Sequence, residues 1–117
     1  MKNISGKTKD INWNAKKEKQ LVEAVLSLKN VDETKRFLRD LMTEKEIQEF
    51  ANRLEAASFL SRDVQYNAII ESTGLSSTTI ARISKWLKGS LGGYRLILAR
   101  LNHHPLSKIE KGLSLSS

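Results

Sequence analysis

The chain has 117 residues, of which 20 are Lys or Arg and 13 are Asp or Glu, so its formal net charge is +7 at pH 7. This length is enough for one domain and hardly enough for two. Because there is no cysteine, a disulfide, a thiolate nucleophile and a cysteine-ligated metal are all excluded. No apolar run approaches the roughly 18–20 residues of a membrane span, and we expect a cytoplasmic protein without a membrane partner.

The N-terminal half predicts two amphipathic helices after a flexible start. Residues 1–11 are polar, and we expect them to be flexible. Beyond Trp13 the apolar residues recur at helical spacing, at Leu21, Ala24, Val25 and Leu28. Asn30 and Val31 interrupt this pattern. Asp32 is then the predicted N-cap of a short helix over residues 32–42, which carries Phe37, Leu38 and Leu41 on one face.

A capping box predicts where the third helix begins. Thr43 and Glu46 have the spacing at which the threonine accepts from the N3 amide and the glutamate reaches back to the N-cap amide. The helix that follows carries apolar residues at helical spacing as far as Leu60, and the pattern breaks over residues 61–63.

Three shorter helices complete the predicted fold. The first runs from about Tyr66 to Thr73 and ends at Gly74, which supplies the left-handed conformation of a tight turn. Ser76 caps the next one, and three glycines over residues 89–93 close it. The last helix extends to about Asn102, and residues 103–117 are expected to form a flexible tail. The sequence therefore predicts an all-α domain of six helices over residues 12–102.

The fourth and fifth predicted helices have the pattern of a helix–turn–helix over about residues 66–88. Counted from Tyr66, the glycine of the turn falls at the ninth position. Leu75, Ile80 and Ile83 fall at the inward tenth, fifteenth and eighteenth positions, where they pack the two helices together. One departure is Ile70 at the fifth position, which is usually small.

The outward face of the fifth helix combines short hydroxyls with positive charge. Small hydroxyl side chains let the backbone approach the major groove closely and bond bases or phosphates, and a helix N-terminus favours a phosphate. Between Val64 and Arg100 the sequence has five basic residues and only one acidic residue, Glu71, as expected of a half that meets nucleic acid. The predicted DNA-binding residues are Tyr66, Asn67, Ser76, Ser77, Thr78, Thr79, Ala81, Arg82 and Lys85.

From LMTEKEIQEFANRLEAASFL through the turn to TTIARISKWLKGSLGGYRLILARL, the chain resembles the Trp-repressor family. It is most similar to the Trp-repressor-like branch of uncharacterised bacterial regulators, in which the GGYRL segment recurs. The resemblance covers about Leu38 to Leu101. It implies an intertwined all-α homodimer that presents one reading head per subunit to double-stranded DNA and acts as a repressor.

The same resemblance implies a position for an effector pocket beside the reading head. In the namesake repressor two arginines stack on a bound tryptophan, and Arg53 and Arg82 stand at the matching positions, with Thr43 matching a nearby threonine. A serine that holds the amino group of the ligand is replaced by Trp86, and an arginine that contacts DNA is replaced by Ala68. The resemblance thus implies that the protein binds DNA at a different operator sequence and does not need tryptophan to do so.

Several of these residues also have purely structural interpretations. Arg53 is better placed to pair with an acid such as Glu49 than to clamp a ligand. Trp86 fits a core or interface anchor, and its spacing from Arg82 also allows a cation–π contact. His103 and His104 are adjacent, so their side chains diverge, and we expect no metal site.

Two functional classes stay open at this point. The first is a homodimeric DNA-binding regulator, with or without a small-molecule effector, which includes a tryptophan-responsive repressor. The second is a helical module that binds another protein. A protein-binding surface would expose large apolar anchors on the fifth helix, whereas the pattern places Ser, Thr, Ala and Arg there. The sequence implies no cofactor and shows no catalytic constellation, so we expect that the protein is not an enzyme.

Overall fold

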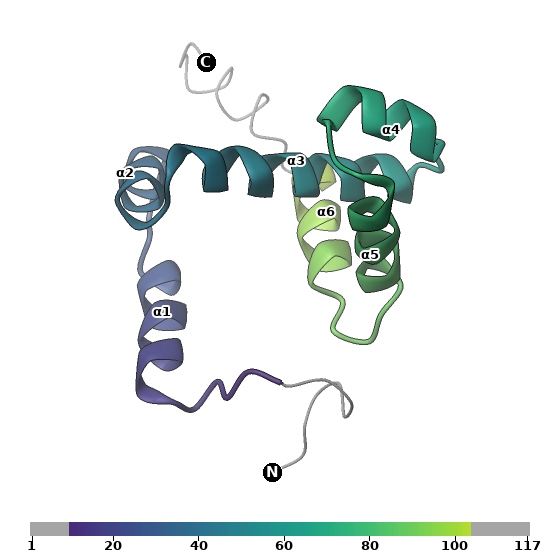
Figure 1. Cartoon of the computed structure of the whole chain (residues 1–117). Coiled ribbons are helices and arrows are strands. Elements are labelled where there is room, and N and C mark those ends of the chain that lie inside the picture. Colours follow the sequence, from purple (N-terminus) through teal and green to yellow (C-terminus); the bar gives the residue numbers. More distant parts are fainter. Residues whose placement is uncertain (1–9, 104–117) are drawn as a thin grey trace. The chain divides into compact units, whose positions relative to one another are not determined.

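A computed structural model describes residues 10–103, which form six helices and no strand (Figure 1). The all-α prediction is therefore confirmed. None of the described helices is long and apolar enough to cross a membrane. The segments expected to be flexible, residues 1–11 and 103–117, fall almost entirely outside the described range. The helices are α1 (Lys16–Leu26), α2 (Val31–Leu41), α3 (Glu44–Ser61), α4 (Tyr66–Thr73), α5 (Ser77–Leu87) and α6 (Gly93–His103).

The chain divides into two compact units, with the boundary near the start of α3, between Ile47 and Gln48. The N-terminal unit contains α1, α2 and the first turn of α3. The C-terminal unit contains the remainder of α3 together with α4, α5 and α6. The helix–turn–helix lies wholly in the second unit.

The helices α1 and α2 of the N-terminal unit bury none of their residues. On α1, Leu26 is 78% exposed and Val25 52%, and on α2 Leu41 is 50% exposed, whereas Phe37 and Leu38 of α2 are half-buried. The predicted amphipathic stripes are therefore present, but this chain by itself does not cover them.

The N-cap of α2 is Asn30, so the prediction of Asp32 was wrong. The Asn30 side chain accepts a hydrogen bond from the Glu33 amide at 2.9 Å, and the Glu33 carboxylate accepts one from the Lys29 amide at 3.0 Å. Asp32 lies inside the first turn and forms an ion pair with Arg36 at 3.0 Å. Asn and Asp are similarly good caps, so two candidates this close in sequence are separated only by the backbone conformation.

The capping box of α3 is confirmed. The Glu46 amide donates to Thr43 Oγ1 at 3.1 Å, and the Thr43 amide donates to Glu46 Oε1 at 2.9 Å. Two amides at the start of α3 that lack a partner within the helix are thereby satisfied.

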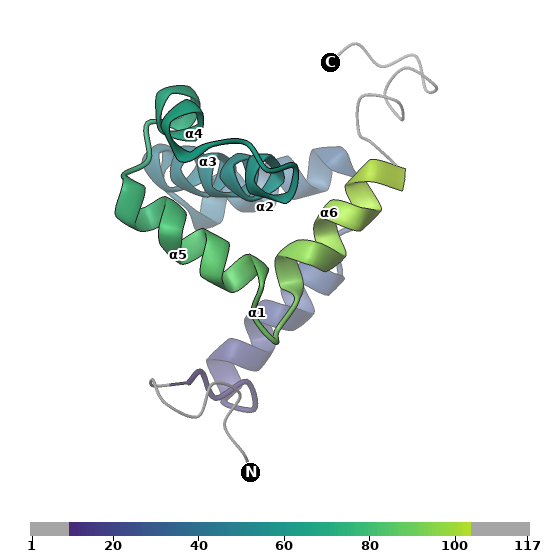
Figure 2. The same ribbon diagram turned by 90° about the vertical axis from the view of Figure 1, so that its right-hand side faces the viewer.

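The C-terminal unit is built around one small apolar core, to which all four of its helices contribute. The buried residues at inward helix–turn–helix positions include Leu75, Ile80 and Ile83, as predicted. Figure 2 shows α4 beside α3, and α5 and α6 joined at one end by their connecting loop. The core residues are Ala56, Ala57, Ile69, Leu75, Ile80, Ile83, Leu87 and Leu98.

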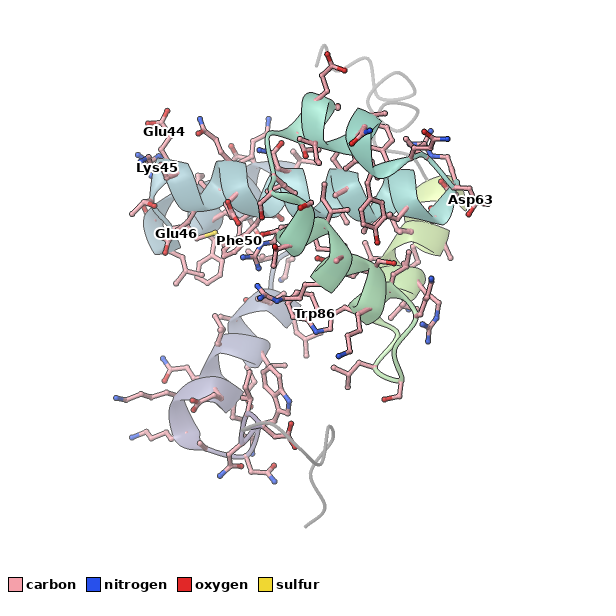
Figure 3. All side chains as sticks on the ribbon, turned by 45° about the vertical axis from the view of Figure 1, so that its right-hand side comes forward. Glu44, Lys45, Glu46, Phe50, Asp63 and Trp86 are labelled. Carbon is pink, nitrogen blue, oxygen red and sulfur yellow. The ribbon has the colours of Figure 1, made fainter. Side chains whose placement is uncertain are left out.

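A left-handed residue ends α3 and turns the chain toward α4. Asp63 has φ +62°, and Figure 3 shows it beyond the end of the helix. The amides of Asp63 and Val64 donate to the carbonyls of Leu60 and Phe59, at 3.1 and 3.0 Å. This is a Schellman arrangement, which satisfies helix carbonyls that would otherwise lack partners.

A buried threonine fixes the turn between α4 and α5. The Thr73 hydroxyl donates to the Ile69 carbonyl at 2.7 Å and accepts from the Leu75 amide at 3.2 Å. Gly74, between them, has φ +74° and is the C-cap of α4, as the sequence predicted. The hydroxyl thus joins the last turn of α4 to the first inward residue of the turn, where water has little access.

We expect Thr73→Val to destabilise the protein by about 1–3 kcal/mol, because it leaves the buried Leu75 amide without an acceptor while it preserves the shape of the side chain. Thr73→Ser keeps the hydroxyl and should cost only about 0.8 kcal/mol for the lost methyl group. Urea unfolding of both variants measures the difference. A valine variant as stable as the serine variant would contradict this account of the turn.

Candidate nucleic-acid interface

The helix α5 is held by one face and presents the other to solvent. Ile80 and Ile83 are fully buried and Leu87 is 8% exposed, so three side chains spaced three or four residues apart anchor the helix in the core. The residues of this segment that were predicted to face outward are exposed in the structure: Ser76, Ser77, Thr78, Ala81, Arg82 and Lys85.

The four consecutive hydroxyls at the start of α5 divide into two pairs. Ser76 is the N-cap, and its hydroxyl accepts from the Thr79 amide at 3.1 Å and donates to Thr79 Oγ1 at 3.0 Å. These contacts occupy Ser76 and Thr79 within the protein. Ser77 and Thr78 are exposed and make no side-chain hydrogen bond within residues 10–103. They are the two hydroxyls available to a ligand.

The positive charges of α5 are not neutralised by the protein itself. Over the described part of the chain the salt bridges are Arg36–Asp32 and Arg53–Glu49, so neither Arg82 nor Lys85 has a carboxylate partner. No acidic residue lies in the first turn of α5 either. An anion that approaches this helix therefore meets two uncompensated cations and no repelling carboxylate on it.

Two predicted residues lie at the start of α4 rather than on α5. Tyr66 is 40% exposed and Asn67 is exposed as well. Both belong to the same unit as α5, so the residues predicted to bind DNA all stand on one helix–turn–helix. Ala68, which follows them, is exposed and has no polar group to offer.

Comparison with known proteins agrees with this arrangement. The family described as Trp repressor protein matches residues 16–102. The chain belongs to this family. A Bacillus subtilis (strain 168) relative described as uncharacterised protein YerC is 40% identical over 82 residues, which cover 70% of this chain and 79% of the relative. The crystal structure of a TrpR-like protein from Eubacterium eligens ATCC 27750 matches with a TM-score of 0.72 at 36% identity, covering 77% of this chain and 93% of that chain.

The family supports DNA binding and transcriptional regulation as the general activity of this chain. The family match begins at the first residue of α1 and ends within α6, so it includes every described helix. The match is therefore broader than the helix–turn–helix by itself.

Arg53, predicted from the family resemblance to line an effector pocket, is engaged within α3. Its Nε atom lies 3.1 Å from Glu49 Oε2, and its guanidinium lies 5.6 Å from the centroid of the Phe50 ring. The prediction that Arg53 pairs with Glu49 is confirmed. A planar ligand would have to compete with the Phe50 ring for the face of the guanidinium.

Tyr94 of α6 also responds to the charge of Arg53. Burial raises the pKa of the Tyr94 hydroxyl, and the nearby Arg53 charge acts in the opposite direction. The phenol is consequently neutral over the physiological pH range. Arg53 of α3 is thus surrounded by Glu49, the Phe50 ring and the Tyr94 phenol, all within the C-terminal unit.

Two of the three roles predicted for Trp86, a core anchor and a contact with Arg82, are absent from the described part of the chain, and that of an interface anchor stays a prediction. It is 46% exposed, so it is not a core anchor of this chain, and Figure 3 shows it on α5. The cation–π contacts in the described part of the chain are Arg53–Phe50 and Arg62–Phe59, so the expected Arg82–Trp86 contact is absent. Trp86 is not buried in the core because it does not lie on the face of α5 formed by Ile80, Ile83 and Leu87.

The remaining predicted pocket residue, Thr43, is the N-cap of α3 and belongs to the N-terminal unit. A shallow hollow in that unit is lined by Trp13, Lys19, Val22 and Glu23, and includes none of the predicted effector residues. Within the described residues no group of three His, Asp or Glu side chains could hold a metal ion.

One residue near the interface was missed by the sequence reasoning. Arg95 of α6 donates from one guanidinium nitrogen to the carbonyls of Leu87 and Gly89, at the C-terminal end of α5. A basic residue in the first turn of a helix is unfavourable for that helix, and this was the signal that could have marked it.

Proposed function

We propose that this protein is a sequence-specific DNA-binding transcriptional repressor, which acts as a homodimer and reads DNA with α5. The observation that carries the proposal is the exposed face of α5, where, among residues 10–103, the Ser77 and Thr78 hydroxyls have no hydrogen-bond partner and Arg82 and Lys85 have no carboxylate partner. Membership of the Trp repressor family supports it.

The two kinds of exposed side chain have different roles in this proposal. Ser77 and Thr78 lie in the first turn of α5, where short side chains reach base edges in the major groove. Arg82 and Lys85 lie one and two turns further along and contact the phosphate backbone. Ser76 and Thr79 act indirectly, through the cap of α5. Tyr66 and Asn67, at the start of α4, contact the phosphate backbone of the DNA. Ala81 has a small side chain, which allows α5 to approach the DNA closely.

A second candidate function is binding to another protein. It is favoured by Trp86, which is 46% exposed on the same helix, and by Leu91, which is 71% exposed in the following loop. Exposed aromatic residues are common anchors in protein interfaces. The uncompensated cations and small hydroxyls favour DNA, and a DNA-binding assay separates the two functions.

Dimerisation is part of the proposal because the N-terminal unit leaves its apolar surface uncovered. Four large apolar residues of α1, Leu21, Val22, Val25 and Leu26, are at least 40% exposed, and so is Leu41 at the end of α2. Four exposed large apolar residues within six positions of one helix are typical of an interface. A second copy that supplies the same surface would cover it, as in an isologous contact.

Tryptophan is not required for DNA binding in this proposal. Arg53 already has Glu49 and Phe50 as partners, and Trp86 stands where the resemblance places a serine that holds the ligand. Because Trp86 does not stack on Arg82, it would exclude tryptophan from the pocket by its bulk, and not by replacing the stacking contact between the ligand and Arg82.

Substitutions on α5 should separate base recognition from phosphate binding. Thr78→Ala should change the preferred sequence at a cost of about 1–3 kcal/mol for the selected site. Lys85→Ala should weaken binding similarly on all sequences and make the salt dependence shallower by about one unit. Selection from a random DNA pool, followed by titration at several salt concentrations, measures both. If Ser77 and Thr78 can both become alanine without a change in preference, α5 does not read the bases.

The proposed dimer should persist at micromolar concentration. Val25→Glu places a charge on the exposed apolar face of α1 and should shift sedimentation toward the monomer, since burial of an unpaired charge is costly. Gln20→Glu adds a charge to an exposed polar position of the same helix and is the matched control. A folded wild-type monomer at this concentration would overturn the intertwined dimer.

Calorimetric titration of tryptophan into the purified protein should give no binding heat, and tryptophan should not change operator affinity. A ligand shifts an equilibrium only through different affinities for the two states. Trp86→Ser, which removes the bulk of the indole, should create or restore ligand binding, whereas Trp13→Ser in the N-terminal unit should not. Tight binding by the wild type with stronger operator affinity would disprove the prediction.

A further inference from the structure

The C-terminal end of α5 is held by a side chain from the next helix. Arg95 Nη1 donates to the carbonyl of Leu87, the last residue of α5, and to the carbonyl of Gly89 at 2.9 Å. The last four carbonyls of a helix have no acceptor role within it, and a guanidinium placed there both bonds them and complements the negative end of the helix dipole.

The loop between the two helices is shaped around the same guanidinium. Gly92 has φ +72°, and a Cβ atom added there would lie 3.0 Å from Arg95 Nη2. Gly92 also starts α6, because its carbonyl accepts from the Leu96 amide at 2.9 Å. The glycine therefore permits both the backbone turn and the approach of the arginine.

The position of Arg95 is unfavourable for its own helix. It is the third residue of α6, whose first turn contains no acidic residue. A cation near a helix N-terminus opposes the helix dipole, and this is where a capping box would place a glutamate. The stabilising effect of the charge falls on α5 instead, across a connection of five residues, 88–92.

We propose that Arg95 is a positioning residue for DNA recognition, which fixes the end of α5 by binding the carbonyl of its last residue, Leu87, and that of Gly89 just beyond it. The inference rests on the proposed function of α5 as the reading helix. The N-terminal turn of α5 is held by Ser76 and its middle by Ile80 and Ile83. At the far end the Leu87 side chain is buried in the core, and Arg95 adds a hydrogen bond to the Leu87 backbone carbonyl. Without Arg95 the last turn of α5 keeps only the side-chain contact of Leu87, so the backbone there can shift.

Hydrogen exchange tests the contact directly, without DNA. Arg95→Gln should raise the exchange rate of amides in the last turn of α5 and in residues 88–92 by about tenfold, the equivalent of one charge-assisted hydrogen bond. Arg100→Gln removes the same charge from an exposed position of the same helix and should leave these amides unchanged. Equal exchange in the two variants would overturn the proposal.

DNA titration then distinguishes positioning from phosphate contact. Arg95→Gln and Arg95→Lys should both lower the ratio of selected to random DNA affinity, and neither should change the salt slope. A uniform loss on all sequences with a slope shallower by about one unit, rescued by lysine, would show a phosphate contact and overturn the proposal. If the wild type binds no DNA, the proposed function fails, while the exchange result still decides whether Arg95 holds α5.

A double-mutant cycle tests the contact independently of the lost charge. Gly92→Ala adds backbone strain and displaces the guanidinium, whereas Gly74→Ala adds similar strain with no atom within 4 Å of the new Cβ. The stability loss from Gly92→Ala should become smaller in the Arg95→Gln background, and that from Gly74→Ala should not. Strictly additive effects of Gly92→Ala and Arg95→Gln would contradict the contact.

Discussion

The structure of the C-terminal unit depends on the burial of one apolar face of α5 against the other helices. Ile80 and Ile83 are fully buried with Ile69 of α4 and with Ala56 and Ala57 of α3. The two alanines carry no side chain beyond Cβ, so the helices can approach α3 closely. Three residues of α5 form this contact, so the opposite face of the helix is exposed. The composition of that face decides what the protein can bind.

Capping interactions at the helix ends also stabilise the structure. Asn30, Thr43 and Ser76 each accept a hydrogen bond from an amide at a helix start. Asp63 and Gly74 adopt left-handed conformations at helix ends. A short helix has many unpaired backbone groups for its length, so a protein made of helices of 8–18 residues relies strongly on caps. The same requirement explains why Arg95 of α6 binds the carbonyl of Leu87, the last residue of α5.

The two units differ in how much apolar surface they cover. The described part of the C-terminal unit, residues 48–103, buries eight hydrophobic residues, whereas α1 and α2 bury none. A chain of this length has a high ratio of surface to volume, and small helical proteins often complete their cores by association. The helix–turn–helix accordingly has its own core in the single chain, while the N-terminal helices lack one.

The sequence by itself determined the helices, the turn and the division of α5 into a buried and an exposed face, because caps, turn residues and the spacing of apolar residues are local features of the chain. The Arg53–Glu49 pair, one helical turn apart, was predictable for the same reason. Only the tertiary structure decided that Trp86 is exposed, that it does not stack on Arg82, and that Arg95 binds the end of α5. The direction of a long side chain depends on the partners that packing brings within reach, and residue spacing along the chain does not specify those partners.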